Sequence, residues 1–399
     1  MSENKRFVYA DNAATTSVHP QVLADMLPFL GEYYGNPSSL YSKGQEVSVR
    51  LEEARKKIAS ILNCEPKEIY FTGCGSESDN WAIKGAVDQY LQRHKVDKCH
   101  IITSKIEHHA VLNTCKALEK KGMEVTYLPV DEYGRVNPQD VVDNLREDTC
   151  IVAIMMANNE IGTIEPIAEI AKLLADKKVL FFTDAVQAVG HIPVDVKKLG
   201  VDMLSLSGHK FRAPKGIGAL YIKSGVVIKN LIDGGGQERS KRGGTENVAS
   251  IMALANALGI ANEEMQDDNA RLAVLRDDLI RRITEEIPES LVTGHPTKRL
   301  PGTASFVFKY IEGESLLLML DAEGICASTG SACSSKSLEP SHVLLSIGLP
   351  HEIAHGSLRL SLSHETTQED VDYIVEKVKK VVQTLRNFSP ICPKELKNR

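Results

Sequence analysis

The chain has 399 residues, of which 42% are hydrophobic and 25% are charged, and its formal net charge is −6. This length exceeds what one compact core accommodates, so it predicts two domains or one large domain with a smaller lobe. The mixed charge argues against a nucleic-acid-binding surface, and no run approaches the roughly 20 apolar residues of a membrane span. The N-terminus has no apolar or Arg-rich signal, so we expect a cytoplasmic protein without a membrane or nucleic-acid partner.

Short apolar runs alternate with amphipathic segments along the first part of the chain. The runs, which we interpret as buried strands, cover residues 68–72, 100–104, 151–157, 179–185, 203–207 and 218–222. The segments between them have helical spacing and include residues 77–92, 109–121 and 165–176. This alternation predicts βαβ units and a mostly parallel sheet. Because the runs are apolar throughout, we expect helices on both faces of the sheet.

The pattern changes after the Gly-rich segment 233–247. Further elements are expected as a long helix over roughly 248–287, an apolar run over 303–311, a helix near 313–321, a loop near 327–337, a strand within 357–363 and a final helix from about 367. Thr367 and Asp370 have the spacing of a capping box for that last helix. We place a domain boundary near residue 265. The prediction is a large domain of residues 16–265 and a smaller α+β domain of residues 1–15 and 266–399.

The cysteines and two short motifs exclude some classes of protein. None of the eight cysteines forms a C-x-x-C pair, so we interpret most as buried thiols, with Cys333 as the candidate exception. The segment "HEIAH" (351–355) matches a zinc-protease motif, but Pro350 and Gly356 leave too little helix to present both histidines. We interpret it as a short connector and expect no metal site. The segment "GCGSES" (73–78) lacks the last glycine of a dinucleotide-binding motif.

Polar residues follow five of the predicted strands at their carboxyl ends, where ligands bind in an open α/β sheet. In chain order they are Gly75, Ser76, His108, Asn159, Asp184, Gln187, Ser207, His209 and Lys210. Because the carboxyl ends of parallel strands meet at one edge, we expect these residues to line one crevice.

The first and last members of this set indicate a phosphate site. Gly75 and Ser76 open a predicted helix, and the N–H groups at a helix N-terminus suit a phosphate. Ser76 and Asp79 have the spacing of a capping box. Ser207 and His209 offer further donors. The pattern therefore predicts an anionic ligand.

The other members indicate that the ligand is an aromatic aldehyde. Lys210 follows a buried strand, where a lysine is costly unless its amine is used, and an amine forms a Schiff base with an aldehyde. The Asp184 carboxylate needs a cation, which a protonated pyridine nitrogen supplies. His108 is flat enough to stack on a ring, and Asn159 and Gln187 suit a ring hydroxyl. Together these residues predict pyridoxal phosphate as cofactor.

Several longer motifs carry a family resemblance that covers nearly the whole chain. They include "DNAATT" (11–16), "TDAVQAVGH" (183–191), "SGHKFRAPKGIGALY" (207–221), "RGGTEN" (242–247) and "STGSACSS" (328–335). With them the sequence resembles the cysteine desulfurases of the NifS/IscS type, which belong to the class V aminotransferases. The resemblance implies the fold type I of pyridoxal phosphate-dependent transferases, with a mostly parallel seven-stranded sheet.

The resemblance also implies roles for individual residues. Lys210 carries the cofactor covalently, His108 stacks on it and takes part in catalysis, and Asp184 pairs with the ring nitrogen. Asn159 and Arg359 are expected to bind the substrate, Arg359 through the carboxylate. Cys333, in the loop near 327–337, is the nucleophile that takes the sulfur.

The implied reaction converts L-cysteine to L-alanine and leaves a persulfide on Cys333. A sulfur-acceptor protein then receives that sulfur for the biosynthesis of iron–sulfur clusters or of other sulfur-containing cofactors or tRNA. The resemblance further implies a homodimer in which Thr245 reaches the phosphate of the other subunit. The alternatives are a selenocysteine lyase or another class V lyase or aminotransferase, although an aminotransferase has no use for a nucleophilic thiol.

Overall fold

The computed structural model describes residues 6–330 and 340–397. Its main sheet has seven strands in the order β2-β8-β7-β6-β5-β3-β4. The strands are β2 (Ile69–Thr72), β3 (His100–Ser104), β4 (Glu124–Leu128), β5 (Thr149–Ala153), β6 (Leu180–Asp184), β7 (Met203–Ser207) and β8 (Gly218–Ile222). Only β8 is antiparallel to its neighbours β2 and β7. The predicted seven-stranded, mostly parallel sheet is confirmed.

Helices cover both faces of this sheet, as the apolar strands predict. Neighbouring residues of one strand enter different apolar clusters: Ile101 packs on one face and Ile102 on the other, and Met203 and Leu204 divide in the same way. The surrounding helices are α3 (Ser42–Leu62), α4 (Gly75–His94), α5 (His109–Glu119), α6 (Pro138–Asp143), α7 (Ile167–Leu174) and α8 (Val196–Leu199). The sheet is therefore buried on both sides, and ligands have access only at its edges.

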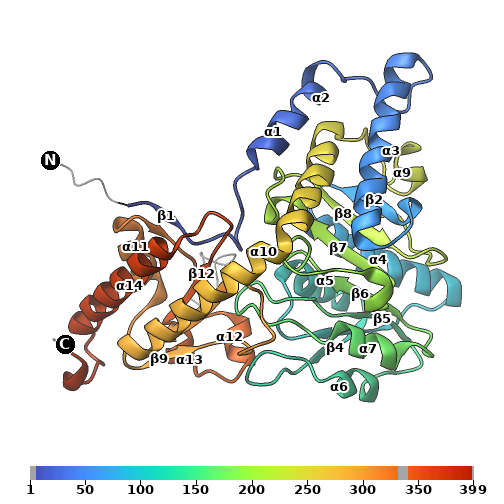
Figure 1. Cartoon of the computed structure of the whole chain (residues 1–399). Helices are drawn as coiled ribbons and strands as arrows, with labels where there is room; N and C mark the ends of the chain where they lie inside the picture. The colour runs from blue at the N-terminus through green and yellow to red at the C-terminus, as the bar shows by residue number, and fades with distance from the viewer. Residues whose placement is uncertain (1–5, 331–339, 398–399) are drawn as a thin grey trace.

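A second sheet lies beyond the long helix α10 (Val248–Glu286), which runs from the helices of the main sheet to this smaller one (Figure 1). The order is β12-β10-β9, all antiparallel, with β9 (Ser290–Val292), β10 (Thr303–Phe308) and β12 (Ser357–Ser361). Helices α11 (Gly313–Ala322) and α14 (Gln368–Phe388) pack here, and β1 (Val8–Tyr9) pairs with β11 (Ile325–Cys326). The first strand, β1, and the last long helix, α14, both lie on this side of the molecule (Figure 1).

The predicted domain boundary near residue 265 falls inside α10, which is continuous there. Leu258 in the first half of the helix packs with the core of the main sheet, whereas Leu279 in the second half packs with the smaller sheet. The division of the chain into 16–265 and the remainder stays a prediction.

The remaining short elements bear on three sequence predictions. Residues His351–Ala354 form the single-turn helix α13, so "HEIAH" is a connector as predicted. The capping box of α14 is confirmed, because Thr367 Oγ1 accepts the N–H of Asp370 (3.2 Å) and Asp370 Oδ2 accepts the N–H of Thr367 (2.9 Å). The other short helices are α1 (Pro20–Met26), α2 (Pro28–Gly31), α9 (Gln237–Ser240) and α12 (His342–Ser346). None of the helices within residues 6–330 and 340–397 combines the length and the apolar run that crossing a bilayer requires.

Candidate active site

A cavity of about 320 Å³ opens at the carboxyl ends of β2, β3, β5, β6 and β7. Its lining includes Gly75, Ser76, His108, Asn159, Asp184, Gln187, Ser207, His209, Lys210 and Arg359. The structure thus brings together the polar residues that follow five strands, as the parallel topology predicts. Thr245 is exposed and is not part of this lining. Cys333 lies outside the described residues.

Lys210 reaches the cavity from the short turn Gly208–Lys210 that follows β7. The turn is closed by the N–H of Gly208, which donates to the carbonyl of Ile217 (3.0 Å). Lys210 Nζ donates to the carbonyls of Ala13 (2.6 Å) and Ala14 (2.9 Å). The N-terminal segment therefore holds the amine at the cavity wall through neutral acceptors.

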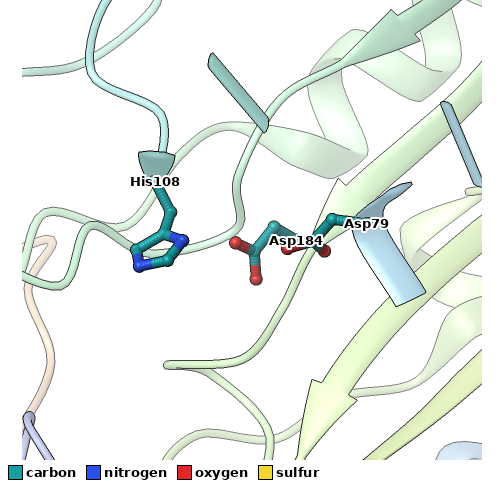
Figure 2. Close-up of side chains that lie close together, drawn as sticks. All are labelled: Asp79, His108 and Asp184. Carbon is teal, nitrogen blue, oxygen red and sulfur yellow. The ribbon is translucent and has the colours of Figure 1, made fainter. Parts of the chain in front are cut away.

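Asp184 ends β6 and is only 5% exposed. Its Oδ1 accepts the N–H of Val186 (2.9 Å). Burial raises the pKa of this carboxyl, and the neighbouring His108 and Lys210 lower it. Figure 2 shows the Asp184 carboxylate between the ring of His108 and the carboxylate of Asp79. The potential at this point of the cavity is thus suited to a cation.

His108 caps the N-terminus of α5. Its Nδ1 accepts the N–H of Ala110 (3.1 Å), so in the neutral ring the proton sits on Nε2. Burial is the largest influence on this ring and lowers its pKa, while Asp184 raises it. His108 is therefore a neutral ring near pH 7 that carries its N–H on Nε2.

The start of α4 differs from its prediction. The helix begins at Gly75 after Cys74, without a side-chain cap, so the predicted capping box of Ser76 and Asp79 is wrong. The physical reason is that the second turn faces the sheet, where Asp79 Oδ1 accepts the hydroxyl of Ser205 (2.6 Å). Among residues 6–330 and 340–397, no side chain accepts from the first N–H groups of α4, which therefore suit an anion.

The backbone at Gly75 approaches the end of the sheet closely. A Cβ at this position would lie 2.6 Å from Val186 Cγ2 and 3.3 Å from Ser207 Cβ. Ser207 itself is buried, and its hydroxyl lies at the same place. The glycine therefore permits a cradle of backbone N–H groups and one hydroxyl that a larger residue would fill.

Arg359 projects from β12 on the opposite side of the cavity. Its Nη2 donates to Asp11 Oδ1 (2.7 Å) and its Nη1 to the carbonyl of Asn159 (2.8 Å). Its Nε is buried and has no acceptor among the described residues. A buried donor without an acceptor is costly, so this guanidinium is prepared for an anionic group.

Gln187 and His209 meet the N-terminal segment. Gln187 Nε2 donates to the carbonyl of Ala13 (2.9 Å), and His209 Nδ1 is 3.1 Å from Thr15 Oγ1. Burial, and then Lys210, lower the pKa of His209 to about 4. His209 is therefore neutral near pH 7, and it offers an anion an N–H group and not a charge.

Two acidic residues of the cavity were not predicted as site residues. The sequence assigns Asp79 to helix capping and does not single out Glu160, although an acid so soon after the apolar run 151–157 is a signal that could mark it. Glu160 is buried and accepts the hydroxyl of Ser341. Burial raises the pKa of Glu160 to about 7.

Comparison with known proteins agrees with this geometry. Residues 8–374 match the family model of the aminotransferase class-V proteins, and the chain belongs to this family. It is 55% identical over 394 residues to the cysteine desulfurase IscS of Methanosarcina thermophila, a match that covers 99% of this chain and 96% of the relative. Within the family the chain therefore groups with the cysteine desulfurases of the IscS type.

Solved structures give the same grouping. A NifS-like protein superposes with a TM-score of 0.88 at 40% identity, over 95% of this chain and all of that one (100%). The protein SspA, solved in complex with cysteine, superposes with a TM-score of 0.79 at 36% identity, over 89% of this chain and 98% of its own. The fold and the family predicted from the sequence are confirmed.

Proposed function

We propose that the chain is a pyridoxal phosphate-dependent cysteine desulfurase, which takes sulfur from L-cysteine and leaves L-alanine. One observation carries this proposal: Lys210, His108, Asp184 and Arg359 line the same cavity. An amine, a neutral imidazole, a buried carboxylate and a guanidinium in one site match a cofactor with an aldehyde and a ring nitrogen, and a substrate with a carboxylate.

Three features of the cavity fit pyridoxal phosphate. The buried Asp184 carboxylate gains a cation when a protonated ring nitrogen lies opposite. The N–H groups of α4 at Gly75 suit its phosphate. The amine of Lys210 suits its aldehyde. When bound, this cofactor supplies an electron sink for the bonds that break at the amino acid.

The residues around these features hold the rest of the group. We assign Ser76, Ser207 and His209 to the phosphate, and Thr245 of the partner subunit would complete that set. His108 would stack on the ring.

The polar side of the ring is assigned separately. Asn159 and Gln187, which line the same cavity, are assigned to its hydroxyl. Asn159 also faces the substrate because its carbonyl already positions Arg359.

Lys210 moves a proton in this proposal, and His108 donates a hydrogen bond. Lys210 Nζ, the amine that would hold the cofactor, takes the Cα proton of the substrate and returns it as the product forms. His108 presents its Nε2–H to the substrate, since its Nδ1 accepts the N–H of Ala110. A proton passes from His108 to the substrate only from the imidazolium form, in which Nδ1 gives up that bond.

Arg359 and Cys333 act on the substrate itself. The free Nε of Arg359 binds the substrate carboxylate and fixes its orientation. The thiolate of Cys333 attacks the substrate sulfur, so that a sulfur–sulfur bond forms as the Cβ–S bond breaks. The carbon fragment takes up a proton and leaves as L-alanine, and the sulfur remains as a persulfide on Cys333 until a sulfur-acceptor protein receives it.

We also propose a homodimer. The segment between α1 and α3 exposes large apolar side chains, among them Leu27, Leu30, Tyr34, Leu40 and Tyr41, and Leu40 is 94% exposed. Such a patch is typical of a protein–protein interface. The exposed Thr245 is consistent with a residue offered to a second copy. A monomeric mass in solution, together with full cofactor binding and activity, would contradict the dimer.

The proposed activity is tested with purified protein loaded with pyridoxal phosphate and given L-cysteine and a thiol reductant. Alanine and sulfide should appear in equal amounts. Lys210→Ala should abolish both products. Absence of alanine from the loaded wild-type protein would overturn the proposal.

A further inference from the structure

Asp79 is a buried acid at the cavity to which the proposed chemistry assigns no role. It lies in the second turn of α4 and is only 1% exposed. Its Oδ1 accepts the hydroxyl of Ser205 (2.6 Å), and Ser205 of β7 is the register partner of Asp184 on β6. The three side chains therefore lie together where two strands and one helix meet.

The carboxylates of Asp79 and Asp184 share one buried site (Figure 2). One oxygen of each, together with a ring nitrogen of His108, lies within a mutual distance of 4.8 Å. Two like charges this close in a site shielded from water cannot both ionise cheaply, so such a pair keeps a proton. The question is which of the two acids carries it.

The groups around the two acids favour the proton on Asp79. Burial raises the pKa of Asp79 well above its usual range, and Asp184 and Glu107 raise it further. Only the Ser205 hydroxyl acts in the other direction. Asp184, in contrast, has a pKa that His108 and Lys210 lower, and the N–H of Val186 binds its charged form. Near pH 7, where the His108 ring is neutral, Lys210 and the N–H of Val186 still favour the charged form of Asp184, so the proton belongs on Asp79.

We propose that Asp79 is a neutral carboxylic acid in the folded protein and positions the ionised Asp184 beside it. The hydrogen bond from Ser205 holds the Asp79 side chain in place. Because Asp79 is neutral, it does not repel the Asp184 carboxylate, which stays ionised at the cavity wall. The inference rests on the proposed function only in that the cation opposite Asp184 is the cofactor ring.

The protonation state of Asp79 is measured on the cofactor-free protein by infrared spectroscopy. The carbonyl stretch of a protonated carboxylic acid should be present at about pH 7, far above the usual pKa of aspartate. Isotopic labelling of the aspartates should shift this band, which separates it from the buried glutamates. Asp79→Asn, which keeps a neutral hydrogen-bonding group of the same size, should remove it.

Two further variants test whether the band comes from an aspartate that lies beside Asp184. Glu107→Gln should leave the aspartate band in place. Asp184→Asn removes the neighbouring charge, so the band should then be lost at a lower pH than in the wild-type protein. An aspartate band that is absent at about pH 7, or that persists in Asp79→Asn, would overturn the inference. None of these readouts requires turnover, so failure of the alanine assay leaves them intact.

Discussion

Arg55 and Glu238 form a buried ion pair that ties the 237–247 segment to α3. Arg55 Nη1 and Nη2 donate to Glu238 Oε2 and Oε1 at 2.9 and 2.8 Å, and each side chain is 3% exposed. Glu238, Arg239 and Ser240 all have positive φ (44°, 57° and 61°). Left-handed backbone costs about 1–2 kcal/mol per non-glycine residue. The ion pair therefore holds a strained segment, the one that carries Thr245, in its place.

Arg55→Met removes the cation and leaves the Glu238 carboxylate buried. The N–H of Phe71 still donates to Glu238 Oε2 (2.9 Å). Breaking a buried ion pair in this way costs about 3–5 kcal/mol. The strained segment can avoid most of that cost by leaving its site. Its opening should therefore become easier by roughly 10²- to 10³-fold.

Hydrogen exchange followed by mass spectrometry measures this opening in peptides that cover 237–247. Arg146→Met is the matched control, since Arg146 likewise pairs with carboxylates, those of Glu124 (2.5 Å) and Asp148 (2.8 Å), but its side chain is 43% exposed. An exposed pair contributes at most about 1 kcal/mol, so this control should leave the segment protected. Unchanged exchange of 237–247 in Arg55→Met, or equal acceleration in Arg146→Met, would refute the reasoning.

Three further predictions concern the cavity. The pKa of Glu160 is raised to about 7, so the folded protein binds a proton that the unfolded chain releases above about pH 4.5; stability is therefore lost as pH rises through 7. Glu160→Gln should be more stable relative to wild type at about pH 8 than at about pH 5, by on the order of 3 kcal/mol, and thermal melts that shift equally at both pH values would contradict this. Gly75→Ala places a Cβ 2.6 Å from Val186 Cγ2 and should weaken cofactor binding by on the order of tenfold or more. Gly31→Ala, where the Cβ meets nothing within 4 Å, is its control; equal affinities in a fluorescence titration would exclude the close approach at Gly75. Borohydride should fix the cofactor to the peptide that contains Lys210, and recovery of another lysine peptide would displace the assignment.

The sequence predicts the main sheet well where strands are buried on both faces. Strands β3, β7 and β8 have the predicted bounds because their runs are apolar throughout. The edge strand β4 was not predicted, since its residues are mostly half-buried or exposed and its apolar signal is weak. The run 151–157 continues past the end of β5 at Ala153, because the buried loop that leads to Asn158 is as apolar as the strand.

The cavity was predictable because parallel strands place their following residues at one edge. The wrong prediction of a capping role for Asp79 has a different origin. Its spacing from Ser76 is that of a capping box, and spacing alone does not reveal that this turn of α4 faces Ser205. The same limit applies to Glu160, whose burial depends on contact with Ser341. The roles of Thr245 and Cys333 came from the family resemblance and stay predictions.

In the proposed reaction Cys333 receives the sulfur of L-cysteine. The direct measurement is mass spectrometry of the protein after a single turnover with cysteine that carries isotopically labelled sulfur, without a reductant. One added labelled sulfur should map to Cys333, with one alanine released for each persulfide formed. Cys74 is the rival thiol, because it is exposed and also lines the cavity. Cys74→Ser should leave the label on Cys333, whereas Cys333→Ser should form neither persulfide nor alanine. Label on Cys74, or alanine formed by Cys333→Ser at the wild-type rate, would contradict the account.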